Sequence, residues 1–394
     1  MAEPFKNLLH ASLVKEAAVH LKQQLPQFDD RQFVRLAGTG LDVLELKARS
    51  LHICSALEHT LPPDFAVAAD ALQAALAPAE PGAAMAQLTG LERGLRGWIL
   101  WPVGEYIARR GQAHPERALL ALHALTQRFT AEFAIRPFIV QHPQLVFATL
   151  QRWVHDDSPH VRRLVSEGSR PRLPWGLQLK QLVADPTPTL PLLQALQDDS
   201  SDYVRRSVAN HLNDIAKDHP QRVAQWLQDH LPDAPPPRRA LLRHASRTLI
   251  KAGDPTVLKA WGLGAAFKGC ATLSLSHGRV KLGDAVALNL HLASTSTRVQ
   301  TLAIDYVVHH VKANGSTSPK VFKGWQLQLP SRGEVTLIKR HSLRPITTRR
   351  YHAGVHGLAV QINGQVVAQG SFMLSIPEAA QEPAQQPAQE PADG

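Results

Sequence analysis

The chain of 394 residues contains only two cysteines, Cys54 and Cys270, and 6% aromatic residues. Two cysteines cannot form a disulfide framework, which indicates a reducing compartment, the cytoplasm. No segment reaches the 18 apolar residues that a membrane span needs, and the charged, amphipathic start is unlike a signal peptide. We therefore expect a soluble cytoplasmic protein of two or three domains with no membrane partner.

Several catalytic signatures are also missing. No G-x-S-x-G, Walker loop or H-E-x-x-H occurs in the sequence. Gly262-Leu263-Gly264 precedes a predicted strand instead of opening a helix, so it does not indicate a dinucleotide site. His352 and His356 lack cysteine or carboxylate partners at zinc-like spacing. We therefore expect no metal and no small-molecule cofactor.

Positive charge is present in excess and is unevenly distributed. The chain has 43 Lys and Arg against 33 Asp and Glu, a net charge of +10. Residues 268–376 hold 13 of these basic residues and three acidic ones. The last 18 residues, 377–394, hold four acids and no base. A basic domain of this kind favours a polyanionic partner such as DNA.

Helical periodicity dominates residues 1–264, and one motif within it repeats. The pattern D-x4-V-R begins at Asp156 and again at Asp199, a period of 43 residues that is typical of HEAT-like two-helix repeats. We expect each Asp and the first Arg of each motif, Arg162 and Arg205, to brace neighbouring units. The prediction is a HEAT-like helical solenoid with a concave binding surface.

The hydrophobic period changes from 3.6 to 2 after residue 264. About seven short alternating runs, separated by turn signals, predict an immunoglobulin-like β-sandwich over residues 265–376. Asn363-Gly364 is a hairpin signal between the last two runs. The fold class is therefore multidomain, α plus β, followed by a disordered Pro/Ala/Glu/Gln tail at 377–394.

The segment most suited to chemistry is residues 156–175. Arg163, Glu167 and Arg170 follow one another at intervals of four and three residues on one helix face. We expect these two arginines and Arg172 to surround the carboxylate and hold it ionised. A second stripe of the same kind, Arg128-Glu132-Arg136, lies earlier in the chain, on a predicted helix that Pro137 ends.

Three blocks of the sequence resemble signature segments of the AlkC-type alkylpurine DNA glycosylases. They are TQRFTAEFAIRPF (126–138), VRRLVSEGSRPRLPW (161–175) and YVRRSVANHLNDIAKDHP (203–220). The resemblance covers residues 1 to about 260, more loosely in the first hundred. Residues 265–376 resemble the immunoglobulin-like domain of one branch of the family. The middle block is the most specific, because ordinary HEAT repeats have no reason to end in SEGSRPRLPW.

The resemblance implies a monofunctional glycosylase of base excision repair. Such an enzyme hydrolyses the N-glycosidic bond of cationic N3-methylated bases in duplex DNA without full base flipping, with 3-methyladenine as the first candidate substrate and 3-methylcytosine as the second. By position, the family's catalytic residues fall on Glu132, Glu167 and Trp175. Residues expected to contact DNA are Arg163, Arg170, Arg172, Arg206, Asn210, Lys217, Lys339, Arg340, Arg349 and Arg350. We expect a monomer that acts at the nucleoid of a bacterial cytoplasm.

Other interpretations of these residues stay open at this point. The Arg128-Glu132-Arg136 stripe could be a solvated salt-bridge ladder, Arg163 and Glu167 an ordinary surface ion pair, and Trp175 a plug between repeats. At the level of the whole protein, the main alternative is a non-catalytic scaffold that binds damaged DNA. A protein–protein adaptor is a third possibility, but it leaves the basic sandwich unexplained.

Overall fold

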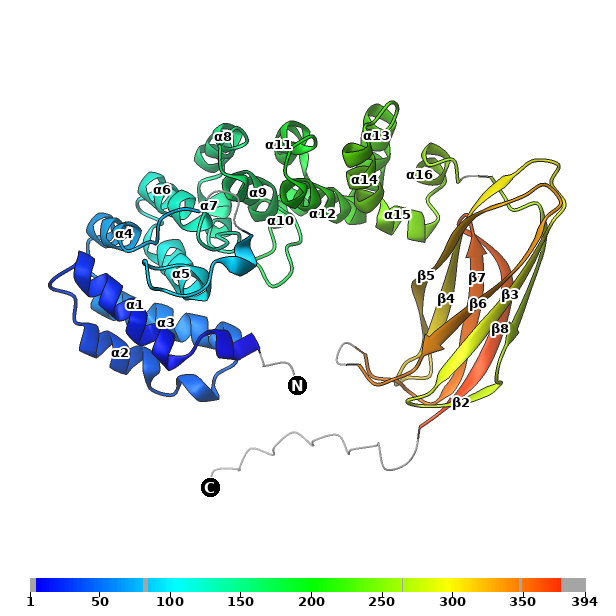
Figure 1. Ribbon diagram of the computed structural model, residues 1–394, viewed down its shortest axis with the longest axis horizontal. Helices are drawn as coiled ribbons and strands as arrows, with labels where there is room; N and C mark the ends of the chain where they lie inside the picture. Colours follow the sequence, from blue (N-terminus) through cyan, green and yellow to red (C-terminus); the bar gives the residue numbers. More distant parts are fainter. Residues whose placement is uncertain (1–4, 81–83, 264, 347–348, 377–394) are drawn as a thin grey trace, which may run out of the picture. The chain divides into compact units, whose positions relative to one another are not determined.

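The computed structural model describes residues 5–80, 84–263, 265–346 and 349–376, which form two compact units, Met1–Ser246 and Arg247–Gly394 (Figure 1). The first unit is helical and the second contains the strands, so the predicted fold class is confirmed. Helices α15 and α16 group with the strands, and the boundary at 264/265 remains a prediction. The tail at 377–394 lies outside the described residues. No helix in the described ranges is long and apolar enough to span a bilayer.

The helices of the first unit form successive antiparallel pairs. Their bounds are η1 (Phe5–Leu8), α1 (Ala11–Gln24), α2 (Asp30–Gly38), η2 (Leu41–Val43), α3 (Leu46–Thr60), α4 (Phe65–Ala74), η3 (Met85–Gln87), η4 (Gly97–Ile99), α5 (Leu100–Arg110), α6 (Pro115–Thr126), α7 (Arg136–Gln141), α8 (Pro143–Trp153), α9 (Pro159–Gly168), α10 (Lys180–Ala184), η5 (Thr187–Thr189), α11 (Leu190–Leu196), α12 (Asp202–Asp218), α13 (Pro220–His230) and α14 (Pro236–Ala245). In Figure 1, α9, α12 and α14 lie in one row, with α8, α11 and α13 in the row above. This two-row arrangement is the expected helical repeat.

The repeated D-x4-V-R motif braces neighbouring repeats through Arg162, as predicted, whereas Arg205 bonds within its own repeat. Arg162 donates from Nε and Nη2 to the two carboxylate oxygens of Asp199, at 2.6 and 3.0 Å. The same guanidinium donates to the carbonyl oxygen of Asp156 at 2.8 Å, and Arg205 makes the matching bond to the carbonyl of Asp199 at 2.5 Å. A bidentate arginine–carboxylate pair fixes both distance and orientation between units.

The predicted helix that reaches Pro137 is wrong. Helix α6 ends at Thr126, and residues 127–135 form turns before α7 begins at Arg136. Arg128 donates to the carbonyl of Ala124 at 2.8 Å and to that of Ala77 at 2.7 Å. It therefore caps the carbonyl groups that the helix end leaves without intrahelical donors, and the salt-bridge ladder does not form.

The described residues of the second unit form eight strands instead of about seven. They are β1 (Gly269–Leu275), β2 (Arg279–Lys281), β3 (Ala285–Ser294), β4 (Gln300–Val311), β5 (Thr317–Leu329), β6 (Glu334–Ser342), β7 (Gly354–Ile362) and β8 (Gln365–Ser375), with two short helices, α15 (Arg247–Ala252) and α16 (Pro255–Ala260), before them. Two sheets, ordered β1-β3-β6 and β2-β8-β7-β4-β5, enclose a core of alternating apolar residues. The predicted sandwich is confirmed.

The predicted hairpin at Asn363-Gly364 is present, and it also holds the two short helices. Both residues have positive φ, 51° and 80°, which a two-residue turn of this kind requires. Gly364 approaches Gly253, in the link between α15 and α16, so closely that a Cβ on Gly364 would lie 2.6 Å from the Gly253 Cα. Only glycines permit this backbone contact.

Three histidines are buried at one side of the sandwich core. His310, His341 and His356 are each at most 5% exposed, and the ring centroids of His310 lie 6.2 and 5.5 Å from those of His341 and His356. Arg349 donates to Nε2 of His310 at 2.5 Å, which makes this nitrogen the acceptor of a neutral ring. Burial, and then the charge of Arg349, lower the pKa of His310 to about 3 and that of His341 to about 4.

We predict that the sandwich loses stability as the pH falls from about 6.5 towards 4. In that range an unfolded histidine, with a pKa of about 6.5, takes up a proton that the native ring does not. Each such histidine can add a slope of up to about 1.4 kcal/mol per pH unit to the free energy of unfolding. Urea unfolding of the full chain, followed by NMR signals of the strands, measures it. His341→Gln should flatten the pH dependence, whereas exposed His277→Gln should not.

Candidate active site

Helix α9 presents its polar residues to its neighbours because its apolar residues occupy the other side. Val161, Leu164 and Val165 are fully buried, and Pro159 occupies the first turn, where no N–H is needed. At the other end, a Cβ on Gly168 would lie 2.6 Å from Cγ2 of Ile135. The glycine therefore lets the helix end approach the turn that carries Glu132.

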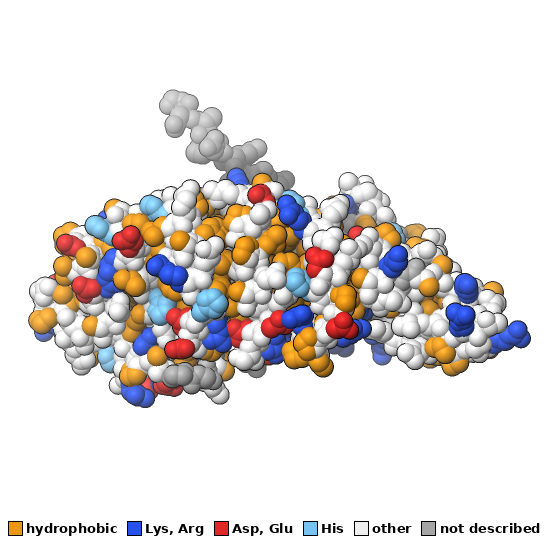
Figure 2. All heavy atoms as spheres, turned by 90° about the horizontal axis from the view of Figure 1, so that it is seen from above, with side chains coloured by type: hydrophobic (Ala, Val, Ile, Leu, Met, Phe, Trp, Pro, Cys, Tyr) orange, Lys and Arg blue, Asp and Glu red, His pale blue; other side chains and the backbone are white. Residues whose placement is uncertain are grey.

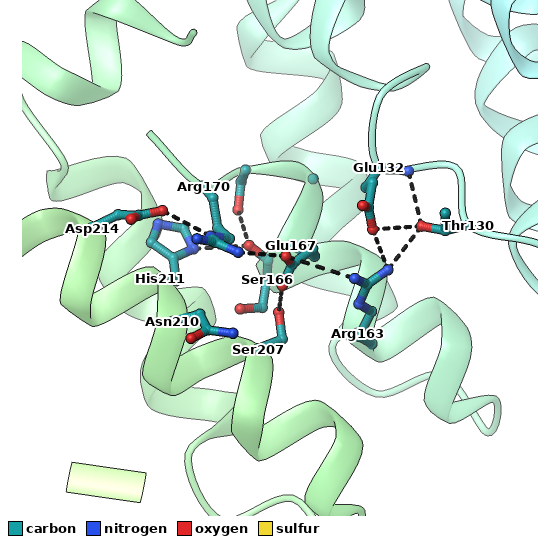
Figure 3. A network of polar contacts seen from close by, with 12 residues as sticks. Thr130, Glu132, Arg163, Ser166, Glu167, Arg170, Ser207, Asn210, His211 and Asp214 are labelled. Carbon is teal, nitrogen blue, oxygen red and sulfur yellow. Dashed lines mark hydrogen bonds and ion pairs between the residues drawn. The ribbon is translucent and has the colours of Figure 1, made fainter. Parts of the chain in front are cut away.

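Glu167 is buried, at 6% exposure, and is completely surrounded by donors (Figure 3). Arg170 donates to its Oε1 at 2.5 Å and Ser207 to its Oε2 at 2.6 Å, and Nη2 of Arg163 lies 3.7 Å from Oε1. Burial by itself raises the pKa of this carboxyl, but the two arginines and the two hydrogen bonds outweigh it and leave the pKa below its usual value. Glu167 is therefore ionised at neutral pH.

Glu132 joins the same network from the turn between α6 and α7. Its carboxylate forms an ion pair with Arg163 and accepts a hydrogen bond from the Thr130 hydroxyl at 2.6 Å. Arg163 thus lies between Glu132 and Glu167, as Figure 3 shows. The structure brings the two predicted glutamates together, although they lie on different elements.

A third carboxylate, which the sequence did not reveal, lies behind Arg170. Asp214 on α12 is 1% exposed, accepts from Nε of Arg170 at 2.8 Å and pairs with Lys217 at 2.8 Å. The 43-residue period aligns Glu167 with Asn210 on this helix. Ser207 and Asp214, about one turn to either side of Asn210, are the residues that bind Glu167 and Arg170.

Three more residues predicted to contact DNA in the helical unit have partners other than Glu167. Arg172 pairs with Asp218 through two bonds of 2.7 Å, so it does not complete a ring around that carboxylate. The Arg206 side chain is 69% exposed, 3.4 Å from Asp202. Asn210 shares a hydrogen bond of 2.9 Å with His244. Their contacts with DNA stay predictions.

Trp175 is held on the surface in a conformation that non-glycine residues rarely adopt. Its φ is +66° and it is 73% exposed. Fully buried Arg136 fixes the loop on both sides of it by donating to the carbonyls of Leu177, at 2.5 Å, and Gly168, at 2.8 Å. A tryptophan presented in this way does not plug a gap between repeats, so that alternative is wrong.

The basic residues predicted in the sandwich lie on β6 and in the segment before β7. Arg340 and Arg350 are exposed, whereas Lys339 lies 6.0 Å from the Trp325 ring and Arg349 holds His310. In Figure 2, Lys and Arg side chains are spread over the sandwich end of the face shown. Arg340 and Arg350 are therefore the two best placed for an external polyanion.

The charges of the helical network nearly balance. The described residues labelled in Figure 3 include three carboxylates, of Glu132, Glu167 and Asp214, against the guanidinium groups of Arg163 and Arg170. The ammonium of Lys217, which pairs with Asp214, and the buried guanidinium of Arg136 add further positive charge beside them. Fixed carboxylates in a site with little water stabilise positive charge that develops in a bound molecule.

Comparisons with known proteins connect this geometry to a family. Residues 128–249 match a family described as DNA alkylation repair enzyme, and residues 269–376 match the C-terminal Ig-like domain of the uncharacterised protein YhaZ. The uncharacterized protein YhaZ of Bacillus subtilis (strain 168) is 35% identical over 92% of this chain and 96% of its own. A solved structure, Pseudomonas fluorescens alkylpurine DNA glycosylase AlkC bound to DNA containing an abasic site analog, is 33% identical and matches with a TM-score of 0.85 over 95% of this chain and all of its own.

The chain belongs to the AlkC family of DNA alkylation repair enzymes. The match to AlkC spans both units, so this AlkC-family protein includes the branch's immunoglobulin-like domain. The family match at 128–249 includes Glu132, Arg163, Glu167 and Asp214, the network described above. The identification made from three sequence blocks is confirmed.

We predict that Trp175→Gly is more stable than Trp175→Ala by about 1 kcal/mol, because glycine adopts a positive φ without steric cost. Both variants lose the indole equally, so the difference reports the backbone conformation alone. Urea unfolding of the two proteins measures it. Trp175→Phe, which keeps both an aromatic ring and the strain, should match the alanine variant to within a few tenths of a kcal/mol. Equal stability of the glycine and alanine variants would contradict the prediction.

Proposed function

We propose that the protein is a monofunctional DNA glycosylase that hydrolyses the N-glycosidic bond of cationic N3-methylated bases in duplex DNA. 3-Methyladenine is the main substrate and 3-methylcytosine a second one. The proposal is carried by one observation, two buried glutamates that share Arg163 in a member of the AlkC family. The AlkC structure that it matches is bound to DNA containing an abasic site analog, which is the form of DNA that base release leaves.

The chemistry needs carboxylates and no general acid. An N3-methylated adenine carries a positive charge, so when the glycosidic bond breaks its electron pair neutralises the base, which leaves without a proton. The sugar becomes an oxocarbenium cation, which the carboxylates of Glu132 and Glu167 stabilise. Water then adds to the sugar and gives its proton to a carboxylate.

The histidine of the network is unsuited to protonating a leaving base. His211 is fully buried and its Nδ1 donates to the carbonyl of Ser166 at 2.9 Å. Burial lowers its pKa to about 4, so it is neutral at physiological pH. This supports the restriction of the substrates to bases that are already cationic.

Trp175 supplies an aromatic face for the lesion. Because the ring is exposed, it can lie against the deoxyribose or the cationic base without full extrusion of the nucleotide. Exposed arginines, Arg206 in the helical unit and Arg340 and Arg350 in the sandwich, would hold phosphates on either side.

Release of free 3-methyladenine from methylated duplex DNA tests the proposal. A glycosylase releases the base and leaves an abasic site, whereas a non-catalytic scaffold binds the same DNA and releases nothing. Binding with no release at saturating protein would favour the scaffold and overturn the proposal.

We predict that Glu132→Gln and Glu167→Gln each slow base excision by about 10²–10⁴-fold while keeping DNA affinity. Each substitution removes a negative charge and keeps the shape of the side chain. Single-turnover excision at saturating enzyme measures the effect, and thermal unfolding checks the fold. Glu92→Gln, whose side chain is 77% exposed, is the matched control and should excise at the wild-type rate. Wild-type rates in both site variants would mean that the glutamates are only structural.

We predict that DNA binding weakens strongly with salt, with a log–log slope near −4 or −5 for about five neutralised phosphates. Arg340→Gln and Arg350→Gln should each make this slope smaller by about 1 with little effect on sequence preference. Fluorescence anisotropy of labelled duplex DNA at several salt concentrations measures the slope. Arg31→Gln, an exposed charge on α2, is the control for general loss of charge. A slope that neither sandwich variant changes would place these arginines away from DNA.

A further inference from the structure

Each of the two glutamates is held by one hydroxyl in addition to arginine. Glu132 accepts from Thr130 at 2.6 Å, and Glu167 accepts from Ser207 at 2.6 Å. The two hydroxyls come from different elements, the turn after α6 and helix α12. Neither residue was singled out in the sequence.

Neighbouring donors determine where the Thr130 hydroxyl hydrogen points. Its oxygen accepts from Nη1 of Arg163 at 2.8 Å and lies 3.4 Å from the backbone nitrogen of Glu132. A hydroxyl has one hydrogen, and with two donors pointing at its oxygen that hydrogen is left for Oε2 of Glu132. Thr130 therefore couples the orientation of Glu132 to that of Arg163.

Ser207 is 3% exposed and donates across to another helix. A serine within a helix commonly bonds to a carbonyl one turn earlier in its own helix. Here its hydrogen goes to Oε2 of Glu167, while Arg170 occupies Oε1. The two oxygens of the carboxylate are thus fixed from opposite sides, which sets the plane of the group.

We propose that Thr130 and Ser207 are positioning residues, which orient Glu132 and Glu167 without cancelling their charge. This inference rests on the proposed glycosylase function. A further arginine at either place would fix the carboxylate equally well, but it would neutralise the negative field that stabilises the sugar cation. A hydroxyl fixes the same group with a neutral dipole.

The electrostatics of Glu167 agree with this role. Burial raises the pKa of its carboxyl, Arg163 and Arg170 lower it, and the hydrogen bond from Ser207 lowers it further. Loss of that bond would raise the pKa, so the ionised form would be lost at a higher pH than in the wild type.

The test compares substitutions that differ only in the hydroxyl. Thr130→Val keeps the shape and removes the hydroxyl, and Thr130→Ser keeps the hydroxyl. We expect single-turnover excision to slow about tenfold or more in the valine variant and to stay within about twofold of the wild type in the serine variant. DNA affinity should stay within about twofold in both.

Ser207→Ala should slow excision to a similar degree and move the acid limb of the pH–rate profile to higher pH. Ser207→Cys keeps the volume with a weaker donor and should fall between alanine and wild type. If the alanine variant unfolds, the excision rate and the acid limb of the cysteine variant test the role of Ser207 instead. A merely structural role would change stability and leave the acid limb in place.

A second measurement does not depend on activity. Titration of ¹³C-labelled glutamate carboxyls by NMR should show a higher pKa for Glu167 in Ser207→Ala than in the wild type. If the wild type released no base, the proposed function would fail while this titration still judged the role of Ser207. Folded Thr130→Val and Ser207→Ala variants with wild-type rates, an unmoved acid limb and an unchanged Glu167 titration would overturn the inference.

Discussion

Arg163 is the group on which the candidate site depends, because one guanidinium lies between two buried carboxylates. Glu132 comes from a turn and Glu167 from helix α9, and neither would stay close to the other without a positive charge between them. The centroid of the Tyr203 ring on α12 lies 5.3 Å from the guanidinium carbon and supports Arg163.

The network extends behind Arg163 into the helical repeat. Burying charges costs several kcal/mol per ion unless every partner is present. Arg170 meets this condition by binding Glu167 on one side and Asp214 on the other. Because Asp214 and Ser207 belong to the following repeat, the stacking of α9 on α12 and the geometry of the carboxylates are one structural feature. The bracing pair Arg162–Asp199 fixes the same two units on another side.

A buried arginine, Arg136, also holds the backbone of the loop after α9. Within the described part of the chain, Arg136 has no carboxylate at hydrogen-bond distance, and its hydrogen bonds go to the carbonyls of Gly168 and Leu177. Burial lowers its pKa to about 10, so the side chain keeps its charge at neutral pH. It thereby offsets the strain of a positive φ at Trp175, and strain of this kind persists only where the surroundings impose it.

The resemblance of three sequence blocks indicated Glu132 and Glu167, whose catalytic role stays a prediction. The sequence by itself determined the order of the two folds and the 43-residue repeat with its Arg162–Asp199 brace. Periodicity and motif spacing carry this information, because each depends on residues near one another in the chain or at a fixed repeat. The segment 127–135 was predicted as helix because its stripe is consistent with one. The carbonyl group of Ala77, which only the folded chain brings to Arg128, overrides that preference together with the nearby carbonyl of Ala124.

Only the tertiary structure decided which groups hold the carboxylates. Ser207 and Asp214 of α12 bind Glu167 and Arg170 at the end of α9, and Arg172 turned to Asp218 instead of Glu167. These contacts depend on how far α12 is rotated and shifted against α9, and the side chains that fill the space between the helices set this placement. A periodic sequence pattern indicates which face of a helix meets its neighbour, but not which residue along that face makes the contact.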